Sequence, residues 1–250
     1  MVAPPAAGRE DPAGASGSTG GRGGRTRSPR LGISPGRRRR GMRRSLLVAI
    51  GILALSATAA PADSPTAALR GAVDAALKIL EDPALKGDAR VRERRLALSR
   101  VAEQAFDFPE IARRVLGRYW RERTAGEREE FTTLFRDLVE RTYSSLLDRY
   151  GGEKVVYLDE SVDGDFARVQ TNVVTPRGTV VRVAYSMLQH DGRWLIVDIS
   201  VENVSYVVNY RSQFNEIIQA SSFPALLKRL RAKVEEFRRA ESARARGRTE

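Results

Sequence analysis

The apolar residues in the second half of the chain change their spacing between residues 194 and 219. Residues 194 to 201 are almost continuously apolar, which is typical of a strand covered on both faces. From Val207 onward the apolar residues recur at helical spacing. The residues on that helical face are Val207, Tyr210, Phe214, Ile217 and Ile218. We therefore expect a strand and a helix to meet at one corner, residues 202 to 205.

The first half of the folded region is predicted to be helical. Ser64-Pro65 is a capping residue followed by proline, and Asp82-Pro83 ends the same helix. Asp107 with Glu110, and Thr124 with Glu127, have the spacing of capping boxes. We expect helices over residues 65–81, 88–105, 108–116 and 125–150, the last ending at a Gly-Gly pair.

A sheet follows these helices. Asp191-Gly192 lies between two apolar runs and predicts a tight hairpin. We expect strands over residues 154–160, 166–175, 179–188 and 193–201, and a last helix over residues 223–237. The predicted class is α+β: N-terminal helices, a curved four-stranded antiparallel sheet and C-terminal helices that enclose an apolar pocket.

The chain divides into four segments by composition. Residues 1–41 are rich in Gly, Pro and Arg and are expected to be disordered. Residues 42–62 combine a short basic start, an apolar stretch and small residues, the pattern of a cleavable secretory signal peptide, and Met42 is the expected natural start. We expect one domain over residues 63–237 and a flexible charged tail over residues 238–250.

Net charge at first favours a nucleic-acid partner, because the chain of 250 residues carries +12. Residues 1–62, however, hold 11 arginines and two acidic residues, a net charge of +9. The expected domain is nearly balanced and has no nucleic-acid motif, so we predict no nucleic-acid partner. The sequence has no cysteine and one histidine, His190, which excludes thiolate and multi-histidine metal sites.

Three groups of titratable residues were weighed as candidate chemistry. His190 precedes the hairpin turn and is interpreted as a solvated turn residue. The acidic residues 159, 160, 163 and 165 lack the glycine and terminal glutamate of a calcium loop. Asp198 and Glu202 lie near the end of the predicted sheet and could act as a carboxylate pair, but hydrogen bonding at the strand–helix corner is the simpler interpretation. We predict no catalytic residues, no metal and no cofactor.

Three stretches carry a family resemblance. They are FDFPEIARRVLGRYW at residues 106–120, FTTLF at residues 131–135 and VENVSYVVNYRSQF at residues 201–214. Together they resemble the MlaC-type, toluene-tolerance family of periplasmic phospholipid-binding proteins over roughly residues 65 to 237. Two positions depart from the usual pattern: Asn203 stands where Gly is common, and Tyr206 where a smaller aliphatic residue is usual.

The resemblance implies a function. It implies a soluble periplasmic carrier that shuttles phospholipid between an outer-membrane lipoprotein–porin complex and an inner-membrane ABC transporter with an MCE-type component. Such a carrier maintains outer-membrane lipid asymmetry, and its bound phospholipid is cargo. Two alternatives remain: an enzyme on a similar cone-shaped, curved-sheet fold, or a lipid-free adaptor protein.

A phospholipid carrier needs a large apolar pocket. Two acyl chains hold about 30 methylenes at ~0.8 kcal/mol each, or on the order of 25 kcal/mol. Aliphatic and aromatic side chains on the inner faces of the predicted helices and strands are the candidate walls. They are Val115, Tyr119, Phe131, Phe135, Leu138, Tyr143, Leu147, Tyr185, Met187, Trp194, Ile196, Val201, Val204, Val207, Phe214 and Ile218.

Overall fold

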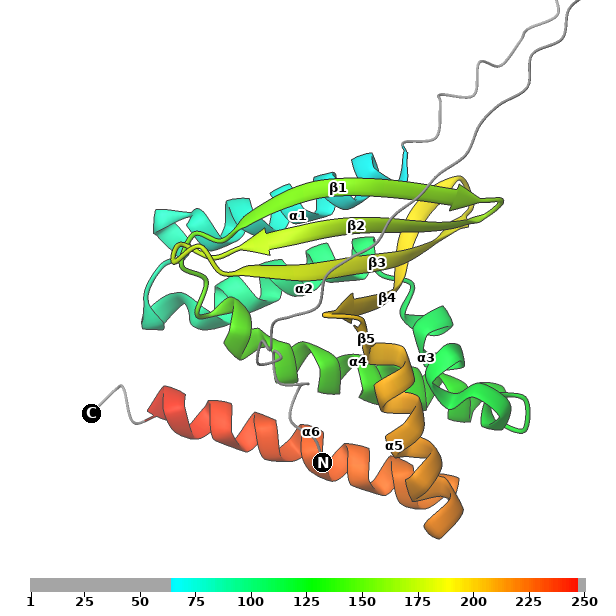
Figure 1. Cartoon of the computed structure of the whole chain (residues 1–250). Helices are drawn as coiled ribbons and strands as arrows, with labels where there is room; N and C mark the ends of the chain where they lie inside the picture. Colours follow the sequence, from blue (N-terminus) through cyan, green and yellow to red (C-terminus); the bar gives the residue numbers. More distant parts are fainter. Residues whose placement is uncertain (1–63, 247–250) are drawn as a thin grey trace, which may run out of the picture. The chain divides into compact units, whose positions relative to one another are not determined.

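The computed structural model describes residues 64–246 (Figure 1). The predicted N-terminal segments 1–41 and 42–62 lie outside the described residues. The helices are α1 (Pro65–Glu81), α2 (Val91–Ala105), α3 (Phe108–Leu116), α4 (Ala125–Leu147), α5 (Tyr206–Ala220) and α6 (Phe223–Arg246). The strands are β1 (Lys154–Asp163), β2 (Phe166–Val174), β3 (Val180–His190), β4 (Arg193–Val201) and β5 (Val204–Ser205). Short 3-10 turns η1 (Pro83–Leu85), η2 (Asp88–Arg90) and η3 (Gly117–Trp120) join the first helices. The predicted α+β class is confirmed.

Local capping interactions set the helix starts. The Ser64 hydroxyl accepts a hydrogen bond from the Ala67 N–H at 3.1 Å, and the Asp107 carboxylate accepts one from the Glu110 N–H at 2.9 Å. At α4 the capping box is reciprocal: Glu127 N–H donates to the Thr124 hydroxyl, and the Glu127 carboxylate accepts from Thr124 N–H. These bonds satisfy backbone donors that the first helical turn leaves unpaired.

The sheet is an antiparallel meander of five strands in the order β1-β2-β3-β4-β5. The sequence predicted four, because β5 is only two residues long and lies inside the expected corner. The predicted hairpin turn is present, with positive φ at Asp191 and Gly192. Two register shifts occur, one between Tyr157 and Asp159 in β1 and one opposite the step from Ser186 to Met187 in β3.

Helices α1 and α2 pack on each other and against one face of the sheet (Figure 1), which we call the inner face. Near the turns that join β1 to β2 and β3 to β4, this face is closed by Leu69 of α1, which is 1% exposed. We call this group the sheet core: Leu69, Ala167, Val169, Met187, Trp194 and Ile196. The opposite face carries polar residues such as Arg168, Gln170 and Arg182.

Helices α3 to α6 form a second apolar cluster, the helical core. Its aromatic centre is Phe131, whose ring lies 5.8 Å from Phe135 and 5.9 Å from Phe214. Its members are Phe108, Ile111, Ala112, Val115, Leu116, Phe131, Phe135, Leu138, Val197, Val207, Tyr210, Phe214, Phe223, Leu226, Leu227, Leu230 and Val234. Val197, from the sheet, joins this cluster, so the strand β4 contributes to both cores.

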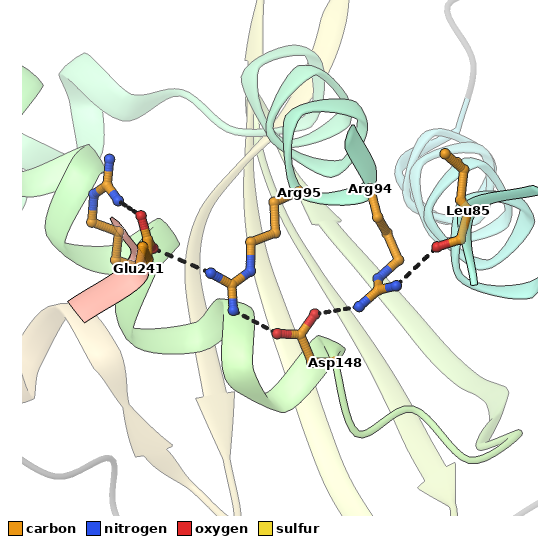
Figure 2. Close-up of polar contacts among 6 residues, drawn as sticks. Leu85, Arg94, Arg95, Asp148 and Glu241 are labelled. Atoms are coloured by element: carbon orange, nitrogen blue, oxygen red, sulfur yellow. Dashed lines mark hydrogen bonds and ion pairs between the residues drawn. The ribbon is translucent and has the colours of Figure 1, made fainter. Parts of the chain in front are cut away.

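The last helix is longer than predicted. We expected it to end at Phe237, but α6 continues to Arg246, so residues 238–246 are helical rather than an irregular tail. The reason is a polar network between α2, α4 and α6 (Figure 2). Asp148 accepts hydrogen bonds from Arg94 at 2.8 Å and from Arg95 at 2.6 Å, and Arg95 also pairs with Glu241 of α6 at 3.2 Å. Arg141 of α4 forms a further ion pair with Glu241.

Candidate functional site

The burial of side chains on the inner face changes from one end of the sheet to the other. Directly paired residues of an antiparallel sheet point to the same side, so Tyr157, Thr171, Val183 and Val201 form one row across four strands. In the middle of this row Thr171 and Val183 are buried, whereas the other apolar side chains of this face toward the β2–β3 loop are only partly buried. We call this region the open half of the inner face; it comprises Val155, Tyr157, Val173, Val181, Tyr185, Ile199 and Val201.

The burial of apolar side chains also decreases along helix α1. Leu69 near its start is 1% exposed, whereas Val73, Leu77 and Leu80 further along are only partly buried. Apolar side chains in a filled core are normally sealed by their neighbours. The facing elements therefore leave apolar surface accessible where α1 passes the open half of the inner face.

A group of tyrosines borders this region. Tyr143 of α4 stacks on Tyr206 of α5, with ring centroids 5.1 Å apart. Burial raises the pKa of Tyr185 to about 12, with Tyr157 and Tyr206 contributing in the same direction. Burial likewise raises the pKa of Tyr143, Tyr206 and Tyr157. These hydroxyls stay protonated at neutral pH, so they supply neutral hydrogen-bonding groups rather than bases or nucleophiles.

A small cavity lies beside the sheet core. It has a volume of about 280 Å³ and lies between α1, α2 and β4. Its walls include Ala68, Ala72 and Ala75 of α1, together with Met187, Trp194 and Ile196. Pockets for drug-sized ligands measure roughly 300–1,000 Å³, so this cavity alone is too small for a diacyl lipid.

The strand–helix corner is held by its two carboxylates. Asp198 accepts hydrogen bonds from the Ser205 hydroxyl at 2.5 Å and from the Val207 N–H at 3.0 Å. Glu202 instead bonds the backbone and guanidinium of Arg182 on β3, and these bonds lower the pKa of Glu202. Asp198 therefore makes the expected hydrogen bonds at the corner, whereas the Glu202 carboxylate bonds β3 instead. Asn203 adopts φ 65°, as the tolerance of Asn for this region predicts.

The remaining candidate chemistry is spread apart. His190 is an exposed residue beside its turn, and its Nδ1 lies 3.4 Å from Asp107 Oδ2. Of the acidic residues 159, 160, 163 and 165, the first three lie in β1, where Glu160 accepts a hydrogen bond from the Thr66 N–H at 2.6 Å. Within residues 64–246, no group of three or more His, Asp or Glu side chains has the geometry to hold a metal ion.

The structure separates the sixteen predicted wall residues into different environments. The helical core contains Val115, Phe131, Phe135, Leu138, Val207 and Phe214, with Ile218 packed against it. The sheet core contains Met187, Trp194 and Ile196, with Tyr185 packed against it. Tyr143 and Val201 are partly buried near the open half, Leu147 and Val204 are exposed, and Tyr119 lies on η3, where its ring contacts Arg118.

Sequence reasoning missed several residues of the open half. Val155, Tyr157, Val173, Val181 and Ile199 were not among the candidates, although they alternate along strands that the sequence predicted. Strand alternation identified the face on which they lie. It gave no signal that α1 would leave part of that face accessible.

Comparisons with known proteins agree with this architecture. The sequence profile described as "MlaC protein" matches residues 70–232, which run from α1 to α6. The chain belongs to the MlaC family. A relative from Haemophilus influenzae, named as the intermembrane phospholipid transport system binding protein MlaC, is 24% identical over 122 residues. That alignment covers 47% of this chain and 57% of the relative, a little over half of its length.

A solved structure has the same fold as this MlaC-family protein. It is a phospholipid-binding protein from Ralstonia solanacearum, determined in complex with a phospholipid. The two structures superpose with a TM-score of 0.63 at 22% identity, over 70% of this chain and 99% of the other. The resemblance found in the sequence is thus confirmed. No helix within residues 64–246 combines the length and apolar character needed to cross a membrane.

Proposed function

We propose that this MlaC-family protein is a periplasmic phospholipid carrier that holds acyl tails against the open half of the inner face. The observation that carries the proposal is the accessible apolar surface along that face and along α1. Apolar side chains of this kind stabilise a bound hydrocarbon chain by about 25 cal/mol per Å² removed from water.

The size of the cargo sets a requirement on the site. Two acyl chains need burial worth on the order of 25 kcal/mol to leave a bilayer. The cavity of about 280 Å³ beside the sheet core can take only part of them. The open half adjoins it through Met187 and Tyr185 on β3, so the tails are proposed to extend from the cavity along this face.

The proposed transport route connects two membranes. We propose that the protein moves phospholipid between an outer-membrane lipoprotein–porin complex and an inner-membrane ABC transporter with an MCE-type component, maintaining outer-membrane lipid asymmetry. Family membership and the name of the Haemophilus relative support this role. ATP is proposed to act on the transporter, since this sequence carries no nucleotide-binding motif.

The proposed mechanism is exchange of lipid without bond making. The tyrosine hydroxyls near the site are held protonated. The carboxylates at the corner are engaged by Ser205, Val207 and Arg182. The side chains at the site therefore support binding, and none of them is arranged for general acid–base chemistry on a bound lipid.

Native mass spectrometry of the protein purified from the periplasm tests the proposal. We expect a bound species heavier than the protein by one phospholipid, and organic extraction should release that lipid intact. A lipid-free protein that turns over a substrate would instead indicate an enzyme. A lipid-free protein that binds only other proteins would indicate an adaptor.

A further inference from the structure

The Tyr157 hydroxyl at the inner face is buried but unsatisfied among the residues that the structure describes. The Tyr157 hydroxyl is sealed from solvent, and no donor or acceptor within residues 64–246 is bonded to it. Tyr157 lies on β1, the edge strand of the sheet, and points to the inner face in the same row as Thr171. A buried hydroxyl without a partner is destabilising, which makes this atom a candidate for bonding to a ligand.

A cation lies over the ring that carries this hydroxyl. The Arg70 guanidinium of α1 is placed over the Tyr157 ring, 4.0 Å from its centroid. Arg70 is exposed and forms no ion pair with a carboxylate of residues 64–246. Thr66, one helical turn before Arg70 on α1, donates a backbone hydrogen bond to Glu160 of β1. This bond joins α1 to the strand that carries Tyr157. Arg70 and Tyr157 therefore lie on a helix and a strand that are held together by a hydrogen bond.

The position of the pair matches the shape of an amphipathic cargo. Tyr157 belongs to the open half, so one side of the pair adjoins the surface proposed to hold acyl tails. Arg70 is solvent-exposed, and β1 is the first strand in the order of the sheet, so it lies at an edge. The pair thus lies at the rim, where apolar surface meets water and where the charged part of a bound lipid would emerge.

We propose that Arg70 and Tyr157 bind the phosphodiester of the lipid cargo, with the guanidinium as the charged donor and the hydroxyl as the neutral donor. This inference rests on the proposed carrier function and specifies which chemical group of the lipid the protein recognises. Guanidinium groups pair well with phosphate oxygens, and charge-assisted hydrogen bonds are the stronger kind. Because Arg70 is exposed, its side chain can swing off the ring and give a phosphate oxygen access to the hydroxyl.

A nearby carboxylate refines the expected specificity. Asp74 lies one helical turn after Arg70 on α1, close enough to act with burial in raising the pKa of Tyr157, while Arg70 acts in the opposite direction. A negative charge at this place opposes a second charge on the ligand. The site is therefore suited to a singly charged phosphodiester rather than a doubly charged phosphomonoester.

The test compares two lipids that share tails but differ in phosphate. Equilibrium binding to phosphatidylglycerol and to diacylglycerol is measured for the delipidated full-length protein and for Tyr157→Phe, Arg70→Gln and the control Asp74→Asn. We expect Tyr157→Phe and Arg70→Gln each to weaken phosphatidylglycerol binding about five- to tenfold. Diacylglycerol binding should not change, and Asp74→Asn should bind phosphatidylglycerol at least as tightly as the wild type.

The outcomes separate this inference from the carrier function. Wild-type affinity of both variants for phosphatidylglycerol, or an equal loss for both lipids, overturns phosphate recognition while the carrier function stands. Failure of the wild type to bind either lipid overturns the carrier function itself. Thermal melting provides a second readout, because Tyr157→Phe removes an unpaired hydroxyl and should leave the melting temperature of the delipidated protein unchanged or higher.

Discussion

The helical core and the open half of the inner face are built from the same kinds of residue but differ in how they are filled. Phe131 in the helical core is fully sealed and contacts the rings of Phe135, Phe214 and Phe223. Val181 and Ile199 in the open half are equally apolar, yet they remain partly exposed. The first region stabilises the fold by internal packing, whereas the second keeps apolar surface available for a ligand.

Truncating one ring in the helical core and one ring beside the open half should give the largest difference in stability between the two regions. Phe131→Ala removes a fully buried ring and is expected to lower the free energy of unfolding by about 3–5 kcal/mol. Tyr143→Ala, at a partly buried stacked pair, should cost only about 1–2 kcal/mol. Urea unfolding of the two variants measures the difference. Equal losses would contradict the distinction between the two regions.

Enlarging a side chain should also destabilise the helical core more than the open half. Val207→Trp introduces bulk into the helical core, where Val207 is 6% exposed, and should cost about 1–3 kcal/mol in strain. Val201→Trp in the open half should cost less than about 1 kcal/mol and should reduce co-purified phospholipid. Melting of delipidated protein and lipid quantification give the two readouts. A destabilised Val201→Trp with wild-type lipid content would place Val201 in a filled core.

The polar network of Figure 2 makes a smaller and pH-dependent contribution. Burial acts to raise the pKa of Asp148, but hydrogen bonds from Arg94 and Arg95 outweigh burial and hold it below its usual range. A carboxyl with a lowered folded-state pKa stabilises the protein above its unfolded pKa of about 3.9, and this is lost as pH falls through the folded-state pKa.

Asp148→Asn is therefore expected to lower the free energy of unfolding by about 1–2 kcal/mol at pH 7, after allowance for partial exposure. Unfolding curves of the variant and wild type should converge as pH falls below the usual carboxyl range. A difference that stays constant down to acidic pH would show that the loss comes from packing rather than from the ion pairs.

The sequence predicted local features well. The caps at Ser64, Asp107 and Thr124 and the turn at Asp191-Gly192 depend on residues a few positions apart, and the structure contains all of them. It missed the end of α6, because the ion pairs of Glu241 with Arg95 and Arg141 join segments about a hundred residues or more apart. No periodicity within the last helix could reveal those partners.

The candidate site was predicted only in its general character. The apolar pattern gave Val207 and Phe214 of the helical core the same standing as Tyr185 and Val201 of the inner face, because periodicity reports which face is apolar and not what covers it. Tyr157 was missed for a related reason. Its alternation is that of an ordinary inward strand residue, and only the structure shows that its hydroxyl has no partner within residues 64–246 and that Arg70 lies over its ring.

Two neighbouring substitutions on β3 test directly whether phospholipid binds on the inner face of the sheet. Val181 points to the open half of the inner face, whereas Val180 points to the opposite face and is 52% exposed. Phospholipid that co-purifies with Val181→Glu and Val180→Glu is quantified, with circular dichroism as the check on folding. We expect Val181→Glu to lose about fivefold or more of its lipid, because a charge would lie against the acyl tails. We expect Val180→Glu to keep the wild-type amount of lipid. Equal lipid content in two folded variants would contradict a lipid site on the inner face.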